Sequence, residues 1–131
     1  MKERDVALTN LRGGILGDIY PQSSNEETFQ NKTLRPVLKL QNDLLVEAFV
    51  NYANKQKRYF YTLSTEKKII YIENAIHKDI KFRNALKGMI IGMFTVDEFR
   101  EYTQNSSNLN KRMMNLLIER LKDQVQLLVV V

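Results

Sequence analysis

The feature that most constrains the fold of this chain is a series of apolar stripes with helical spacing. From about Ser24 to Gln126, apolar side chains recur every three or four residues and so fall on one face of an α-helix. Helix-capping residues interrupt the series at Ser64, Asp79 and Thr95. No segment shows the apolar–polar alternation of a half-buried strand. The pattern therefore predicts an all-α, single-domain helical bundle of about four to five helices.

The chain divides near residue 22 into two regions of different character. Residues 1–22 contain three glycines and a proline and show no sustained periodicity, so we expect an irregular N-terminal arm or loop there. Residues 23–131 form the helical bundle domain, since 131 residues suffice for one core and are too few for two. The cluster Gly13-Gly14-x-x-Gly17 lacks the Gly-Lys-Ser/Thr ending of a phosphate-binding P-loop, which favours a flexible linker.

The central helix of the predicted bundle extends to about Gln56. Its two adjacent apolar stripes cover close to half of its circumference, which is more than a surface helix needs. Pro36 interrupts the pattern without changing its phase, so either the helix kinks there or a second helix starts with this proline in its first turn. Val46 and Val50 fall on the side otherwise occupied by charged residues. We predict that both lie in a helix–helix interface, most readily between two subunits of a homodimer.

The chain ends in an apolar, β-branched segment that includes Leu128, Val129 and Val130. The segment is too short to span a bilayer and too apolar to stay free in water, so we assign these three residues to the same interface. Nowhere does the chain contain a run near eighteen apolar residues, and we expect no membrane-spanning helix. The N-terminal residues carry both charge signs and are not followed by the apolar stretch of a signal peptide, which favours a cytoplasmic location.

One histidine and no cysteine restrict the chemistry that this chain can perform. Thiol nucleophiles, disulfides and sulfur-ligated metal sites are excluded. His77 follows Glu73 by four residues, whereas a di-iron bundle needs Glu-x-x-His on two helices, so a structural or surface role is favoured. Asp97, Glu98 and Glu101 lie in the first turns after a cap, where acids favour the helix dipole without any catalysis. We predict no catalytic residue, no metal and no cofactor.

The formal net charge of +5 permits an acidic partner. Basic residues flank the aromatic connector 59–61, and together they are the candidate nucleic-acid contacts: Lys55, Lys57, Arg58, Lys67 and Lys68. Aromatic and basic side chains suit single-stranded nucleic acid, but the same composition is typical of a connector packed between helices and flanked by solvated lysines. The basic residues from Lys78 through Lys81, Arg83 and Lys87, with His77 nearby, are a further candidate patch for nucleic acid, but on a helix they point in several directions rather than along one stripe.

Four segments resemble a small, uncharacterised family of bacterial helical proteins: residues 28–36 (TFQNKTLRP), 38–43 (LKLQND), 87–95 (KGMIIGMFT) and 110–114 (NKRMM). Members of this family sometimes carry the label glyoxalase. Glyoxalases are built either on βαβββ modules or around a His-x-His-x-Asp-His cluster, and this sequence contains neither pattern. Our leading hypothesis is a non-catalytic helical protein that self-associates and acts by binding. The alternatives are a nucleic-acid-associated protein and the glyoxalase-type enzyme that the label implies.

Overall fold

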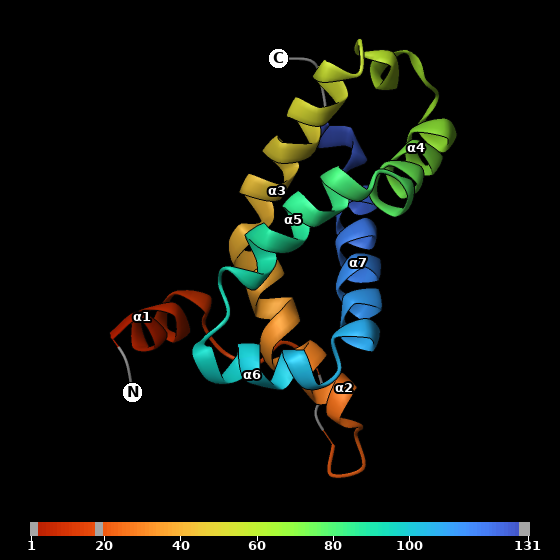
Figure 1. The fold of residues 1–131 in the computed structure, drawn as a ribbon. Coiled ribbons are helices and arrows are strands. Elements are labelled where there is room, and N and C mark those ends of the chain that lie inside the picture. The colour runs from red at the N-terminus through yellow and green to blue at the C-terminus, as the bar shows by residue number, and fades with distance from the viewer. Residues whose placement is uncertain (1–2, 18–19, 129–131) are drawn as a thin grey trace.

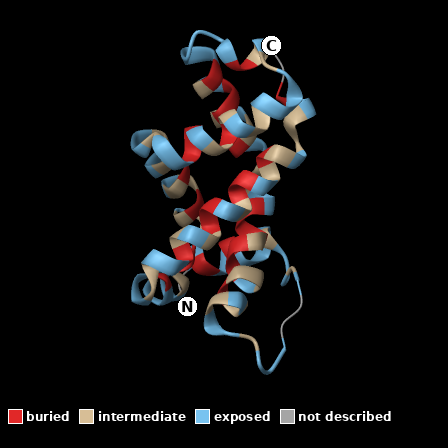
Figure 2. Cartoon of the chain, turned by 90° about the vertical axis from the view of Figure 1, so that its right-hand side faces the viewer, coloured by how far each residue is buried: buried red, intermediate tan, exposed pale blue. Residues whose placement is uncertain are grey.

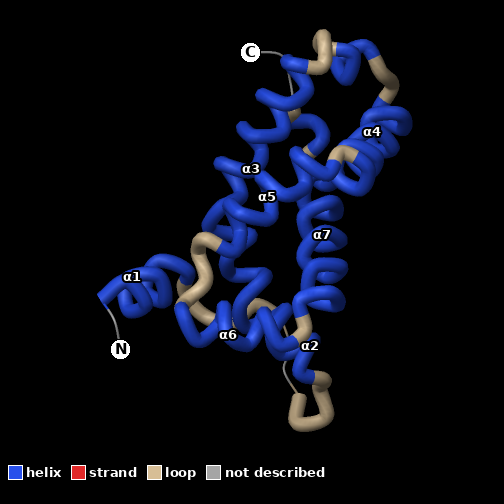
Figure 3. The backbone as a smooth tube through the Cα atoms, viewed as in Figure 1, coloured by secondary structure: helices blue, strands red, loops and turns tan. Residues whose placement is uncertain are grey.

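The described part of the chain, residues 3–17 and 20–128 of a computed structural model, folds into helices, most of which are joined by short connections (Figure 1). No strand occurs among these residues (Figure 3), which confirms the predicted all-α class. The helices exceed the predicted number because α1 was not expected and a π turn separates α2 from α3. They are α1 (Glu3–Arg12), α2 (Asn25–Phe29), α3 (Arg35–Lys55), α4 (Thr65–Lys78), α5 (Ile80–Ile91), α6 (Val96–Gln104) and α7 (Ser106–Asp123).

The predicted central helix continues through Pro36 by way of one π turn. Helix α2 leads into the turn η1 (Gln30–Leu34), which leads directly into α3. Pro36 lies in the first turn of α3, where its ring and its missing N–H disturb the ordinary bond to the fourth residue back. In the π turn, the N–H of Arg35 bonds instead to the carbonyl of Gln30. The helix therefore widens just before the proline and continues beyond it.

The core runs along the length of the bundle, with buried residues from α3, α4, α5 and α7 facing one another (Figure 2). Phe49 of α3 is fully buried and packs edge-on against Phe60 of the turn η2 (Tyr59–Thr62), with ring centroids 5.2 Å apart. At the other end, the ring of Phe94 lies 5.6 Å from that of Phe29 and 5.8 Å from that of Tyr102. These aromatic clusters, one near each end of α3, hold the other helices around it.

The junction between α4 and α5 lies at Asp79, as the capping pattern predicts. The carboxylate of Asp79 accepts the N–H of Phe82 at 3.1 Å and the hydroxyl of Tyr52 at 3.0 Å. The bond from Phe82, joined by that from Tyr52, lowers the pKa of Asp79. Burial, together with the bond to Asp79, raises the pKa of Tyr52 to about 12. The junction ends α4 and lets α5 pack against both α3 and α4.

The prediction of an irregular N-terminal arm is wrong for residues 3–12, which form α1. The buried residues of α1 are Asp5 and Leu8, and the side chain of Arg12 is only 6% exposed. A helix that turns two charged groups and one leucine toward the body has no apolar stripe, so its sequence carries no periodic signal. Gly13 and Gly17, both at positive φ, then lead the chain away from α1.

A candidate anion-binding pocket

A cavity of about 400 Å³ opens where the C-terminal end of α4 meets α5 and α7. Three of its lining side chains are permanent cations, and no carboxylate lines it among the described residues. Arg83 and Lys87 stand one turn apart on α5, while Lys111 comes from α7. The lining residues are His77, Arg83, Lys87, Asn110, Lys111, Met114 and Asn115. The cavity is therefore basic and rich in hydrogen-bond donors.

The guanidinium group of Arg83 is anchored at the end of α4. Its Nη1 donates to the backbone carbonyl of His77 at 3.1 Å. This carbonyl belongs to the last turn of α4, where backbone oxygens lack partners inside the helix. The bond uses one of the five donors of the guanidinium and leaves the others for a ligand. Arg83 is thus both positioned and still able to bind.

Asn110 is held in one orientation by a neighbouring tyrosine. The hydroxyl of Tyr102, a residue only 7% exposed, donates to the Oδ1 of Asn110 at 2.6 Å. Because this bond occupies the amide oxygen, the Nδ2 donors of Asn110 remain for another partner. The ion pairs within the described residues include neither Lys87 nor Lys111. The pocket therefore presents fixed donors and unneutralised positive charge.

This arrangement favours an anionic ligand. Cations that share a cavity repel one another, and an anion placed among them removes that repulsion while accepting charge-assisted hydrogen bonds. Met114, which is 5% exposed, contributes an apolar patch to the lining. The site can thus hold a negatively charged group beside a small organic one.

Sequence reasoning found part of this pocket and missed the rest. It singled out His77, Arg83 and Lys87 but treated the basic residues of this region as pointing in several directions. The spacing of four residues places Arg83 and Lys87 on a common face of the helix, but it does not show which element that face meets. Lys111 and Asn110 carried no comparable signal, because only the packing of α7 brings them to the same cavity.

The predicted nucleic-acid contacts lie at the opposite end of α4. Lys68 and Arg58 face aromatic rings, with the Lys68 ammonium 5.4 Å from the ring of Phe60 and the Arg58 guanidinium 5.8 Å from that of Tyr61. Phe60 is fully buried and Tyr61 half-buried, so within the connector only Tyr59 is well exposed. Lys55, Lys57 and Lys67 are exposed. The rings of this connector mostly pack inward, which leaves little surface for base stacking.

The predicted interface residues are placed within a single chain. Val50 is buried in the core, Val46 is half-buried against it, and Leu128 is 1% exposed. The burial of these three residues therefore requires no second subunit. Val129 and Val130 lie outside the described residues. On α3 the apolar side chains left exposed are Leu40 and Leu44, at 36% and 50%.

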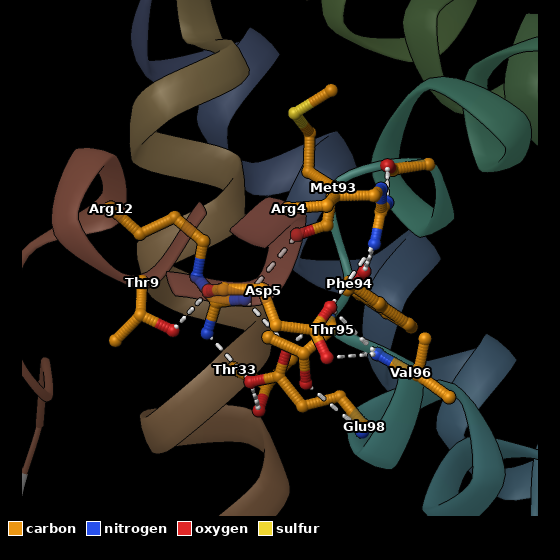
Figure 4. A network of polar contacts seen from close by, with 11 residues as sticks. Arg4, Asp5, Thr9, Arg12, Thr33, Met93, Phe94, Thr95, Val96 and Glu98 are labelled. Carbon is orange, nitrogen blue, oxygen red and sulfur yellow. Dashed lines mark hydrogen bonds and ion pairs between the residues drawn. The ribbon is translucent and has the colours of Figure 1, made fainter. Parts of the chain in front are cut away.

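A second polar cluster surrounds Glu98, one of the three acids noted in the sequence (Figure 4). Arg12 donates from Nη1 and Nη2 to the two carboxylate oxygens of Glu98, at 2.5 and 2.6 Å. Glu98 also accepts the hydroxyl of Thr33 and the N–H of Thr95, both at 2.8 Å. Burial by itself would raise the pKa of Glu98, but these hydrogen bonds outweigh it and the pKa lies below its ordinary value. The carboxylate is therefore held charged as a structural tie.

The same cluster joins α1 to the connection between α5 and α6 (Figure 4). The Asp5 carboxylate accepts the N–H of Val96, the first residue of α6, at 3.2 Å. Arg4 donates to the carbonyls of Gly92 and Phe94, at 2.7 and 2.9 Å. An acid thus meets the start of one helix and a base meets the end of another, as the helix dipoles favour. The other two acids, Asp97 and Glu101, are exposed.

The described residues contain no group of three or more histidine, aspartate or glutamate side chains placed to hold a metal ion. Within the same residues, no helix combines the length and the apolar character that crossing a membrane requires. His77 is exposed at the end of α4 and lines the basic pocket.

Comparison of the chain with models of known protein families, with curated proteins and with solved structures found no match. The resemblance to the bacterial helical family therefore stays a prediction. The function has to be argued from the geometry of the pocket.

Proposed function

We propose that this protein acts by binding a small anionic ligand in the basic pocket formed by α4, α5 and α7. The observation that carries the proposal is the convergence of Arg83, Lys87 and Lys111 on one cavity that no described carboxylate lines. Two other basic side chains, Lys122 and Arg12, pair with acids of the same chain, Glu73 and Glu98 respectively. The ion pairs of the described residues include none of the three pocket cations, so an anionic ligand would serve as their counterion.

The experiment measures anion binding by the full chain. Phosphate, sulfate and acetate are titrated while the side-chain amide signals of Asn110 and Asn115 are followed by NMR. We expect saturable shifts in the wild type and a loss of affinity of about tenfold or more in Lys87→Gln/Lys111→Gln, because each lost charge-assisted hydrogen bond contributes roughly 1.5–3 kcal/mol.

The matched control is Lys55→Gln/Lys67→Gln, which removes the same formal charge at the other end of α4. Its affinity for the anions should stay within about twofold of the wild type. The pocket side chains that contact the anion are unchanged, and the effect of charges far from the pocket is screened by salt. Equal losses in both double variants, or the absence of any saturable shift, would contradict a localised site.

A nucleic-acid-associated role is the second candidate, favoured by the net charge of +5. Binding of this kind is recognised by a steep fall of affinity with salt, because neutralised phosphates release counterions. Titration of a labelled single-stranded RNA and a DNA duplex at several salt concentrations tests it. A flat salt dependence or no binding argues against it.

Self-association and a cytoplasmic location belong to the proposal as well. A homodimer now draws its support from Leu40 and Leu44, which lie one turn apart on α3 and are exposed in the single chain. Sedimentation of the wild type and of Leu44→Lys at micromolar concentration tests the dimer. A monomeric wild type would contradict it. Val50→Lys is unsuited to this purpose because Val50 is part of the core.

A further inference from the structure

We infer that the anion is the phosphate group of a small phosphate monoester, whose organic part lies in the remainder of the pocket. This inference rests on the proposed anion-binding function and narrows it to one class of ligand. Three features of the pocket carry it: its charge, the arrangement of its donors and its shape.

The charge of the pocket fits a dianion better than a singly charged group. Arg83, Lys87 and Lys111 bring three positive charges to one cavity. A carboxylate or a phosphate diester carries one negative charge and would leave two of the three without a counterion. A phosphate monoester carries about 1.5 to 2 negative charges at neutral pH, so it neutralises most of the local excess.

The donors approach the cavity from different elements. Arg83 and Lys87 come from α5, whereas Lys111 and Asn110 come from α7. A monoester phosphate has three free oxygens in a pyramidal arrangement, so donors from two helices can reach separate oxygens. A carboxylate offers two oxygens in one plane and suits a single planar guanidinium instead. The arrangement around the cavity therefore favours the phosphate.

The size and lining of the pocket leave room for an organic group. Its volume of about 400 Å³ lies within the range of small-molecule sites. Met114 provides a buried, polarisable surface for apolar atoms, and Asn115 provides an amide for hydroxyl groups. Inorganic phosphate alone would leave this part of the cavity unused.

The same geometry disfavours a polynucleotide as the occupant. A nucleic-acid strand needs cations that follow its backbone, whereas these cations converge on one cavity. The nearest member of the other basic group on α4 is Lys68, which lies about 13 Å from His77 along the helix. Between them lies Glu73, whose carboxylate pairs with Lys122. No continuous basic track joins the two regions along this helix.

Calorimetric titration of the full chain tests the inference with five probes: glycerol 1-phosphate, AMP, inorganic phosphate, dimethyl phosphate and acetate. We expect at least one monoester to bind about tenfold or more tightly than dimethyl phosphate and acetate, each of which carries only one negative charge. We also expect that monoester to bind more tightly than inorganic phosphate, because its organic part contacts Met114 and Asn115.

Two variants localise the effect. Lys111→Gln removes one of the three positive charges and a donor that comes from α7, so the preference for monoester over acetate should fall by about fivefold or more. Lys55→Gln is the control and should leave that preference unchanged. Circular dichroism and the thermal midpoint of each variant establish that the fold is intact before binding is compared.

The outcomes separate this inference from the proposed function. If acetate binds as tightly as the monoesters, the inference is wrong but the anion pocket is not. The same holds if inorganic phosphate binds as tightly as both monoesters. A short RNA that outcompetes the monoesters, with a steep salt dependence, would overturn it in favour of nucleic acid. If none of the anions binds, both the inference and the proposed function fail.

Discussion

Two regions of this molecule are held together by different physics. The bundle of α3, α4, α5 and α7 is assembled by buried apolar side chains such as Phe49, Ile76 and Leu86, each fully removed from water. At the junction where α1 meets the α5–α6 connection, the main contacts are instead the ion pair between Arg12 and Glu98 and bonds to backbone groups (Figure 4). Apolar burial stabilises the first region, and paired charges orient the second.

The difference matters because the two kinds of contact respond to different perturbations. Apolar burial is non-directional and roughly proportional to area, so it is insensitive to pH and tolerant of small shifts. A buried charge pair contributes through geometry, and removal of one partner leaves the other charge without compensation. The junction should therefore respond to single charge changes and to acid, whereas the core should respond to lost volume.

The largest expected effect is in the core. Phe49→Ala removes a fully buried ring that contacts Phe60 at 5.2 Å and Tyr71 at 6.2 Å between ring centroids. We expect the free energy of unfolding to fall by about 3–5 kcal/mol, the usual cost of deleting a buried phenylalanine. Urea unfolding followed by circular dichroism measures it.

The matched control for Phe49 is Tyr59→Ala, because Tyr59 is 59% exposed. That substitution should change the free energy of unfolding by no more than about 0.5 kcal/mol. Similar losses in the two variants would mean that the aromatic cluster at this end of α3 does not carry the stability assigned to it.

The next effect concerns the charge pair of the junction. In Glu98→Gln the side chain can still accept the backbone N–H of Thr95. The substitution leaves Arg12, whose side chain is only 6% exposed, without its counterion. We expect the contact between α1 and the rest of the chain to be weakened by roughly 1–3 kcal/mol. Hydrogen exchange of residues 3–12 should accelerate while that of α3 stays unchanged.

The double variant Arg12→Met/Glu98→Gln sharpens this comparison. Because it removes both charges, it should cost less than the sum of the two single changes. Strict additivity of the two single effects would show that Arg12 and Glu98 are not coupled, and the account of the junction would then be wrong.

A smaller effect is expected from pH, again at Glu98. Its hydrogen bonds to Arg12, Thr95 and Thr33 overcome the effect of burial and lower its pKa in the folded protein. In the unfolded chain a glutamate has a pKa of about 4.3, so the unfolded state takes up the proton first. The stabilisation is therefore complete above about pH 4.3 and is lost as the pH falls further, through the folded pKa.

Unfolding of the wild type and of Glu98→Gln between about pH 6 and pH 3 measures this contribution. The difference in stability between the two proteins should shrink as the pH falls. A difference that stays constant across this range would contradict the lowered pKa of Glu98.

The contrast between the two regions also explains what the sequence could predict. The core helices carry apolar stripes and capping residues, so their class, the break at Asp79 and the caps at Ser64 and Thr95 follow from local patterns. Helix α1 carries no such pattern because it binds through Asp5 and Arg12. Its partners lie more than eighty residues away in the chain, beyond the reach of periodicity.

The residues of the candidate site likewise divide into those that a local sequence pattern identifies and those that only the packing of the helices brings in. Arg83 and Lys87 share a helix face that their spacing alone specifies. The contribution of Lys111 and Asn110 depends on how α7 packs, which no local pattern encodes. Val46 and Val50 illustrate the opposite problem: the sequence indicates that their side of α3 is covered, but not whether the same chain or a second one covers it.

The smallest expected effect on stability is in the basic pocket, whose three cations take part in none of the ion pairs of the described residues. Lys87→Gln/Lys111→Gln should change the free energy of unfolding by no more than about 0.5 kcal/mol, with a slight gain at low salt because repulsion with Arg83 is relieved. Phosphate added to the wild type should raise its thermal midpoint by mass action, and the double variant should lose that response. Thermal unfolding of both proteins with and without phosphate makes the comparison. A loss of more than about 1 kcal/mol in the ligand-free double variant would place these lysines with the junction, as residues that hold the fold, rather than with a binding site.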